Sequence, residues 1–365
     1  MSVYPTEVIL YGSVNMPEAD AATTGGAIDL TRRISFCDMT ATSTLNVVSS
    51  SASDTATRAV VQFRDASGII QAPTFTTLTG TTKVTMGAGT AQRLLAGAIS
   101  GASATGPLAN PAGTAAVGDV AIMQNTLTIT AHTCQAGSTQ ATGTTPALIK
   151  LQAGDGASVT LGMIIRTTGG TGPNQLRMAC STSGTGSGQY GTDIIAVNRA
   201  WTVLPDNTTT YEVAPGFLFE ILPNPVTSVV RPFATAAADI VGGSTRIYYE
   251  KAFQLNTDGT TALTSATMTK QVDPAGLYAA GGAFDINPCT ALNDTVTVAN
   301  RQTVPGSGVG SWSTGAAPQS VNLAAQSAAS NAAAQAQGFW MRMTIPAGMA
   351  PLNSSVDLRP GGNTT

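Results

Sequence analysis

Charged side chains are scarce in this chain of 365 residues. They make up 10% of it, against about 25% in a typical soluble domain. Thr, Ser, Ala and Gly take their place, which is unusual for the surface of a dispersed monomer. A protein held in a large assembly, in contrast, can cover itself with hydroxyls and small apolar groups. The composition therefore favours a component of an assembly, and we expect a homo-oligomer.

Basic residues are too few and too dispersed for a nucleic-acid binder. The chain has 17 Lys and Arg against 20 Asp and Glu, a formal net charge of −3, and no basic cluster that could displace phosphate counterions. It has no run of 18 apolar residues, so we expect no membrane-spanning helix. The opening sequence MSVYPTEVILYGS lacks the basic start and apolar run of a signal peptide. We therefore expect synthesis and assembly in a cytoplasm, with neither nucleic acid nor membrane as a partner.

Cysteine and histidine are rare as well. Cys37, Cys134, Cys180 and Cys289 lie far apart in the sequence, without the short spacings of a zinc site or redox motif. We interpret them as reduced, buried thiols. His132 is the single histidine, and its spacing from Cys134 leaves a metal pair conceivable, although no nearby Asp, Glu or Cys would complete the site. We predict no metal, no cofactor and no catalytic residue.

Aromatic residues are only 5% of the chain, which disfavours a sugar-cleaving enzyme. Paired carboxylates could in principle hydrolyse a glycoside. The acidic residues that stand out are better explained as turn residues, because they lie beside Gly, Thr or Asn; they are Asp155, Asp193, Asp206 and Asp258. The glycine-rich runs Gly184–Gly188 and Gly306–Gly310 lack the strand and helix of a phosphate-binding loop, so we interpret them as surface loops.

Short segments with an alternating apolar pattern recur along the whole chain. Ala59–Arg64 and Arg246–Phe253 are examples, and Gly, Pro, Asn and Asp separate such segments. This pattern is typical of β-strands in sandwiches and barrels. Because single cores rarely grow to this chain length, we predict an all-β protein of two or three tandem domains, either β-sandwich, immunoglobulin-like or small barrel.

Two segments rich in Gly, Ala or Pro indicate where the domains meet. They are Gly97–Gly118 and Pro223–Pro225, which lack an apolar period or interrupt it. We predict an immunoglobulin-like β domain at 26–105, a β module at 106–222 and a C-terminal immunoglobulin-like β domain at 223–365.

Residues 1–25 have two interpretations. In one they form an N-terminal arm that adds a strand to a neighbouring subunit, with Tyr4, Val8, Ile9 and Tyr11 exposed until the arm docks. In the other they form a first strand of the protein's own first domain.

Three stretches resemble modules of virion proteins from tailed bacteriophages. Thr42–Thr57 with Phe63–Gly68 resembles an immunoglobulin-like repeat, in which a Ser-Ser, Asp-Thr loop precedes a hairpin with Asp and Gly. Gly162–Arg177, with Val197–Trp201 and Pro205–Val213, is similar to a small β module of phage tail and capsid-associated proteins. Tyr248–Thr260 with Trp340–Gly348 looks like a further phage immunoglobulin-like domain.

The resemblance implies a virion structural protein, not an enzyme, whose partners are the major capsid protein or other virion proteins. The chain has no heptad runs or tandem fibre repeats, which favours a head decoration or cement protein that bridges capsid subunits. The alternative is a tail, baseplate or tail-fibre component that binds other tail proteins or a host-surface glycan. A sugar-cleaving tail enzyme is the third possibility, and no catalytic motif supports it.

Overall fold

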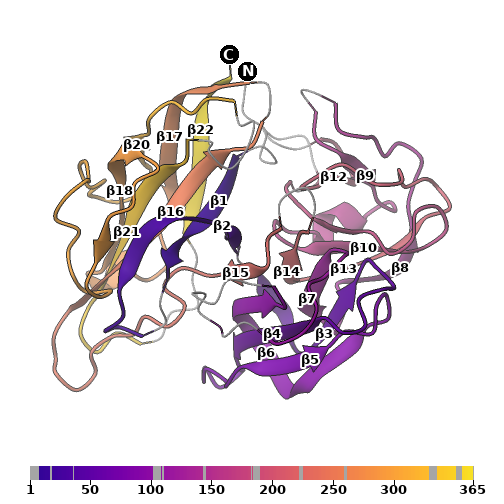
Figure 1. Ribbon diagram of the computed structural model, residues 1–365, viewed down its shortest axis with the longest axis horizontal. Coiled ribbons are helices and arrows are strands. Elements are labelled where there is room, and N and C mark those ends of the chain that lie inside the picture. Colours follow the sequence, from indigo (N-terminus) through magenta and orange to yellow (C-terminus); the bar gives the residue numbers. More distant parts are fainter. Residues whose placement is uncertain are drawn as a thin grey trace.

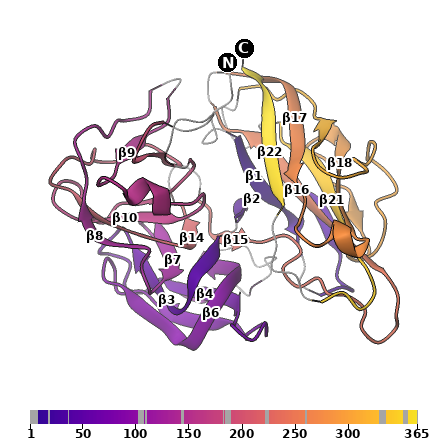
Figure 2. The same cartoon turned by 180° about the vertical axis from the view of Figure 1, so that it is seen from behind.

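The computed structural model is almost entirely β-structure. It describes residues 8–16, 19–35, 37–101, 108, 111–142, 145–181, 183, 190–221, 225–258, 261–328, 335–350 and 356–364. Within these ranges the regular elements are 22 strands and two short 3-10 helices. The prediction of an all-β fold with sandwich-type packing is confirmed. Figures 1 and 2 show two lobes side by side.

The terminal lobe contains strands from both ends of the described chain. One of its layers comprises β1 (Val8–Asn15), β2 (Thr24–Ile34), β16 (Arg246–Asn256), β18 (Ala283–Leu292), β19 (Thr297–Val298) and β21 (Gln337–Ile345). The other layer comprises β17 (Leu263–Val272), β20 (Gln319–Asn322) and β22 (Asp357–Thr364), and the 3-10 helix η2 (Tyr278–Ala280) follows β17 in the chain. Phe284, Phe339 and Met341 of the first layer share a core with Leu263 and Met268 of the second. The lobe is therefore a β-sandwich.

The central lobe is built around a second apolar core. Its main strands are β3 (Asp38–Ser49), β4 (Arg58–Arg64), β5 (Thr74–Thr77), β6 (Val84–Ile99), β7 (Val120–Gln124) and β14 (Gly216–Phe219). Leu45, Val61, Ile122 and Phe217 are fully buried members of this core. Consecutive residues of β4, β7 and β14 are buried, so both faces of these strands are covered and their burial does not follow period two.

A separate module occupies the chain between β7 and β14. It consists of β8 (Ile129–Thr133), β9 (Leu148–Lys150), the 3-10 helix η1 (Asp155–Ser158), β10 (Ile164–Gly169), β11 (Leu176–Met178), β12 (Ile194–Ala196) and β13 (Thr210–Ala214). Four strands form a sheet in the order β11-β10-β13-β8, and β9 pairs with β12. Ile149, Ile165, Trp201 and Val213 lie in the core of the module. The module is thus an insertion into the central lobe, because β7 and β14 pair with each other.

The short strand β15 (Ser228–Val230) joins the two lobes. It pairs in parallel with β2 of the terminal lobe and antiparallel with β6 of the central lobe. The resulting order is β14-β7-β3-β6-β15-β2-β1-β16-β21-β18 within one 13-stranded sheet. Backbone hydrogen bonds therefore connect the lobes continuously, which makes them one body and not two domains on a linker.

Buried polar groups reinforce this junction. Arg33 of β2 pairs with Glu220, which follows β14, and the Asn198 side chain of the module donates to the same carboxylate. All three side chains are largely buried. A buried charge is tolerated when it is paired and hydrogen-bonded, so this contact holds the terminal lobe, the central lobe and the module in one arrangement.

The strand pairing cuts across the boundaries predicted from the sequence. β2 spans the predicted boundary at 25/26, and it packs with strands of the C-terminal block. β7 and β14 lie inside the predicted module at 106–222, yet β7 pairs with β3 and β14 with β7. The three boundaries therefore do not separate the packed units of the structure. Gly97–Ile99 of the first predicted linker belong to β6, and local composition carries no information on which strands pair.

Candidate interaction sites

The predicted N-terminal arm is a strand of the protein's own sheet. Tyr11 of β1 pairs with Phe253 of β16 on one side and with Arg33 of β2 on the other. Val8 and Tyr11 are buried, Ile9 is half-buried, and Tyr4 lies outside the described residues. The prediction of a free arm is therefore wrong for residues 8–15, because both edges of β1 are already paired. The alternative of a first strand of the protein's own fold is closer: β1 pairs within the sheet of the terminal lobe, and its Tyr11 also packs in the core that contains Leu45 and Val61.

His132 takes part in a small polar cluster of the module. Its Nδ1 lies 2.7 Å from Asp155 Oδ2, and the Tyr211 hydroxyl donates to the same carboxylate. Burial, followed by this hydrogen bond, raises the pKa of Tyr211 above its usual range. Asp155 therefore does more than stabilise a turn. Its carboxylate holds both the His132 imidazole and the Tyr211 phenol, which lie on adjacent strands. The described residues contain no group of three or more His, Cys, Asp or Glu that could hold a metal ion.

The four cysteines are free thiols in unreactive surroundings. Cys37, Cys134 and Cys289 are buried, and Cys180 is half-buried. Burial is the main cause that raises the pKa of Cys37 to about 11 and those of the other three to about 12. Since the thiolate is the reactive species, these side chains are placed for packing and not for nucleophilic or redox chemistry.

The other acidic residues proposed as turn residues do stabilise loops. Asp193 accepts from the backbone N–H groups of Gly154 and Gly156 at 3.0 and 2.8 Å. Asp206 accepts from the Thr208 hydroxyl and backbone N–H, and these bonds lower its pKa to about 2. Asp258 accepts from the Thr261 N–H at 3.1 Å. The Gly306–Gly310 run is part of a loop that bridges to β18, whereas Gly184–Gly188 lies outside the described residues.

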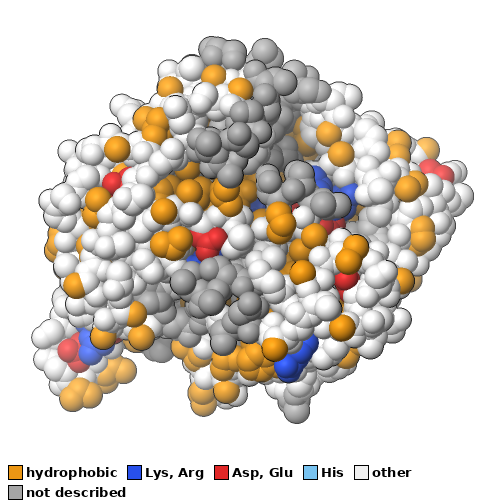
Figure 3. Space-filling view, in the orientation of Figure 1, with side chains coloured by type: hydrophobic (Ala, Val, Ile, Leu, Met, Phe, Trp, Pro, Cys, Tyr) orange, Lys and Arg blue, Asp and Glu red, His pale blue; other side chains and the backbone are white. Residues whose placement is uncertain are grey.

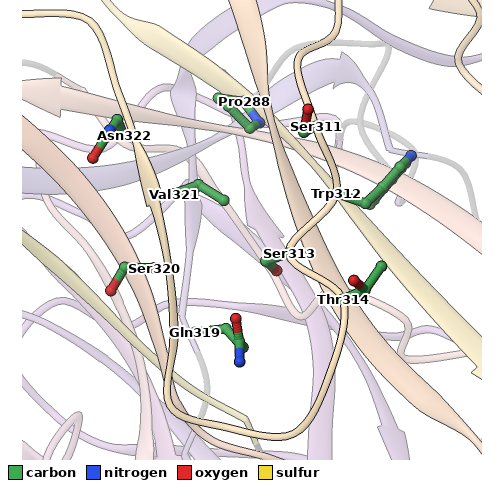
Figure 4. Close-up of a pocket in the computed structure, with 9 residues that line it drawn as sticks. All are labelled: Pro288, Ser311, Trp312, Ser313, Thr314, Gln319, Ser320, Val321 and Asn322. Atoms are coloured by element: carbon green, nitrogen blue, oxygen red, sulfur yellow. The ribbon is translucent and has the colours of Figure 1, made fainter.

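A groove of about 460 Å³ opens on the terminal lobe between two extended segments. Its lining is uncharged and rich in hydroxyl and amide groups: Pro288, Ser311, Trp312, Ser313, Thr314, Gln319, Ser320, Val321 and Asn322. Figure 4 shows the side chains of Ser313, Gln319 and Val321 between the two segments, while the ring of Trp312 points away from them. The sequence analysis missed this groove, because a polar run such as Ser311–Thr314 does not stand out in a chain rich in Ser and Thr.

Exposed apolar side chains are spread over both lobes. They are Ile69, Ile70, Phe75, Val117, Leu161, Val203, Leu204, Ile240, Val241, Ile247, Val272 and Val304. In Figure 3 apolar side chains recur across the visible face, with few charged ones between them. Single exposed apolar residues are common on any protein. On this surface, exposed apolar residues that are adjacent in the sequence occur on loops and beside a strand edge.

The loop between β15 and β16 presents Ile240 and Val241 to solvent. These side chains are 78% and 99% exposed, and the loop extends from the lower left of the terminal lobe in Figure 1. The Asp239 carboxylate accepts from the N–H groups of Val241 and Gly242 at 3.2 and 2.7 Å, and the Asp239 carbonyl accepts from Gly348 N–H at 3.1 Å. The apolar pair is therefore displayed on an ordered turn.

A second apolar cluster surrounds β5 on the central lobe. Phe75 on this strand is 44% exposed, and Ile69 and Ile70 in the preceding hairpin are 59% and 36% exposed. Within the described part of the chain β5 pairs only with β4. One backbone edge of β5 is thus unpaired beside an exposed aromatic ring, a combination that suits protein association.

Comparisons with known proteins do not assign this chain to a family. No protein-family model matches the chain, and no curated protein matches it. Among solved structures, the crystal structure of the infectious bursal disease virus VP2 subviral particle aligns with a TM-score of 0.13 and 9% identity, over 99% of this chain and 68% of that chain. A likeness at this level carries no argument. Among the described residues, no helix is long and apolar enough to cross a membrane.

Proposed function

We propose that this chain is a structural protein of a bacteriophage particle, and that it acts as capsid cement by bridging capsid subunits. The observation that supports the proposal is that exposed apolar side chains occur at two separate places, one on each lobe, and that the two lobes share one sheet. The turn with Ile240 and Val241 belongs to the segment before β16, and the cluster around Phe75 belongs to the central lobe. A body with contacts on both lobes can touch more than one neighbour.

The surface chemistry fits binding to an assembled lattice. Each apolar cluster is small, so each contact alone is weak. When a rigid body makes one contact, the second becomes intramolecular, and avidity exceeds single-site affinity by about 10²–10⁴-fold. With charged residues at 10% of the chain, few ion pairs are available to the interface. The contact should therefore persist at high salt, which screens charges and leaves apolar burial intact.

The proposal is tested by counting the protein in purified phage particles with quantitative mass spectrometry. A cement protein should be present in a fixed ratio to the major capsid protein, set by the shell lattice. The purified protein should also bind assembled shells much more tightly than isolated capsid subunits. Absence from particles, or equal binding to shells and free subunits, would contradict the proposal.

The second candidate is a tail, baseplate or tail-fibre component that binds other tail proteins or a host-surface glycan. The neutral groove lined by hydroxyl and amide groups favours this alternative, because such groups can hydrogen-bond sugars. Copy number separates the two candidates, since a tail component would occur in the small number set by the symmetry of the tail. Electron microscopy of particles labelled on this protein would show its position directly.

A further inference from the structure

The hairpin of β4 and β5 exposes a continuous apolar run on the central lobe. Between Ile69 and Phe75 every apolar residue is exposed, and the two polar residues of the run are half-buried. β4 and β5 lie at the lower end of the central lobe in Figure 1. Exposed apolar residues that gather in this way are typical of a surface that a partner covers.

Two arginines of β4 lie beside this run without a carboxylate partner. Arg64 pairs with Ile70 across the hairpin, and the guanidinium carbon of Arg58 lies 5.6 Å from the centroid of the Phe75 ring. Every Lys and Arg of the chain is among the described residues. Of these, only Arg58, Arg64 and Lys150 form no salt bridge in the described part of the chain. Two of the three unpaired cations therefore lie at one apolar surface.

Positive charge exceeds negative charge around Arg64. Arg93 pairs with Arg64 across the β4–β6 ladder, and Arg93 and Arg231 both donate to the one carboxylate of Asp38. The Asp65 carboxylate is engaged within the hairpin, where it accepts from two backbone N–H groups at 2.9 and 3.0 Å. Burial, followed by the nearby charge of Arg93, lowers the pKa of Arg64, as expected for a cation beside another cation. The three arginines are far apart in the sequence, so only the fold brings them together.

The chemistry of this surface defines its partner. Cations beside apolar side chains are complementary to carboxylates beside apolar side chains. Nucleic acid is less well matched, because phosphate binding relies on many cations and would leave the apolar run uncovered. At a rise of about 3.3 Å per residue, Arg58 and Arg64 lie roughly 20 Å apart along β4. An extended segment of about seven residues spans that distance.

We propose that this hairpin surface, the run Ile69–Phe75 with Arg58 and Arg64, docks an acidic and apolar segment of another protein. Carboxylates of the segment pair with the two arginines, and its aliphatic side chains pack on the run. The identity of the partner as a virion protein rests on the proposed function, whereas the binding of an acidic segment does not. Because such ion pairs are partly exposed, they select the partner more than they strengthen the contact. The apolar part of the contact persists at high salt.

The probe is the heptapeptide Asp-Val-Thr-Leu-Thr-Val-Asp with blocked ends. Two matched peptides carry Asn or Lys in place of both Asp residues. Binding to the whole chain is followed by NMR titration of the backbone amide signals. We expect the Asp peptide to shift signals of residues 58–77 and to bind about fivefold more tightly than the Asn peptide at low salt, from two exposed ion pairs. The Lys peptide should bind most weakly.

The charge-reversal variant combines Arg58→Glu with Arg64→Glu, and Lys150→Glu on the module is the matched control. The double variant should invert the order, so that the Lys peptide binds most tightly, and the control should keep the original order. A role of the arginines in folding alone would not invert it. Among the described residues the Arg58 side chain makes no hydrogen bond. If the double variant does not fold, as judged by its thermal transition, Arg58→Glu alone should bring the Asp and Lys peptides to similar affinity.

Several outcomes would overturn the proposal. They are the absence of binding by the Asp peptide, equal affinity of the Asp and Asn peptides, and an unchanged order of affinities in the charge-reversal variant. Signal shifts confined to residues outside 58–77 would overturn it as well. So would a single-stranded oligonucleotide that displaces the Asp peptide and binds more tightly. Failure of peptide binding leaves the copy number in particles unaffected, so the two proposals fail independently.

Discussion

Arg301 donates through Nη2 to Glu250 Oε1 at 2.7 Å, and the two side chains are only 1% and 4% exposed. Glu250 also accepts from Phe233 N–H at 3.0 Å. The pair connects the loop after β19 with the middle of β16. In a chain with so few charges, this ion pair lies inside the terminal lobe and not at its surface, so its role is to fix the packing of that loop.

Replacement of Arg301 should therefore be strongly destabilising. Arg301→Met leaves the Glu250 carboxylate buried without its partner, which should lower the free energy of unfolding by about 3–5 kcal/mol at neutral pH. Urea denaturation measures the loss. Arg359→Met is the control, because Arg359 and Asp357 form a pair in which the side chains are 65% and 37% exposed. That control should change stability by less than about 1 kcal/mol. Equal losses of unfolding free energy in Arg301→Met and Arg359→Met would contradict a structural role for the buried pair.

The pH dependence of the Arg301→Met variant has a definite sign. Burial raises the pKa of Glu250, and the guanidinium of Arg301 opposes that rise. Without the arginine the pKa of Glu250 should rise further. A carboxyl with a raised pKa takes up its proton more readily in the folded state, so its contribution to stability is greatest at low pH and is lost as the pH rises through the folded pKa. The deficit measured by urea denaturation should therefore shrink as the pH is lowered towards the range of an ordinary Glu.

Gly25 should not tolerate a side chain. Its φ is +90°, and a Cβ there would lie 2.6 Å from Cη2 of the buried Trp340. Gly25→Ala should cost about 2–5 kcal/mol of unfolding free energy, from the left-handed backbone and the clash together. Gly68→Ala is the matched control, with φ +79° and no atom within 4 Å of the added Cβ. It should lower the unfolding free energy only by the amount that the left-handed backbone conformation causes. Similar losses in the two variants, measured by tryptophan fluorescence in urea, would argue against the clash.

The thiols should be unreactive in the native protein. Since their pKa values are raised to about 11 and 12, the thiolate fraction at neutral pH is very small. We expect almost no reaction with a disulfide reagent in buffer and complete modification in urea. Cys180 should react first on mild destabilisation, because it is the most exposed of the four. Rapid modification of Cys37 in the folded protein, or intact disulfides in fresh particles, would contradict this prediction.

The two apolar contacts should act together in shell binding. Val241 is 99% exposed, so Val241→Ser should change stability by less than about 0.5 kcal/mol. Phe75 is 44% exposed and lies 5.6 Å from the Arg58 guanidinium carbon, so Phe75→Ser should destabilise by about 1 kcal/mol and leave the chain folded. Each should weaken binding to shells by about tenfold, and the double variant by more than either, since avidity needs both contacts. Sedimentation with decoration-free shells provides the measurement, with Thr77→Ser on β5 as control. Unchanged occupancy of the double variant would exclude these clusters as contacts.

The sequence predicted the type of the elements better than their arrangement. Ala59–Arg64 is recognisable as a strand from its β-branched and aromatic residues, although both of its faces are buried in the structure. The pairing of Tyr11 with Phe253 joins strands that lie far apart in the sequence, and no local pattern specifies it. The groove combines Pro288 with residues 311–314 and 319–322, which come together only because the strands fold into two layers. The groove therefore could not be predicted from the sequence alone.

The insertion of the module has a consequence for how such a protein can change. Gln124 N–H donates to the Pro215 carbonyl at 2.9 Å, so the chain leaves the central lobe and returns to it at the same point. Genetic exchange of residues 125–214 would leave β7 and β14 paired and the two lobes in place. A replacement would still have to supply cations for Asp119, which is 4% exposed and pairs with Arg177 and Arg199 of the module. Apart from buried contacts such as this one, the module and the two lobes can then change in sequence independently within one chain.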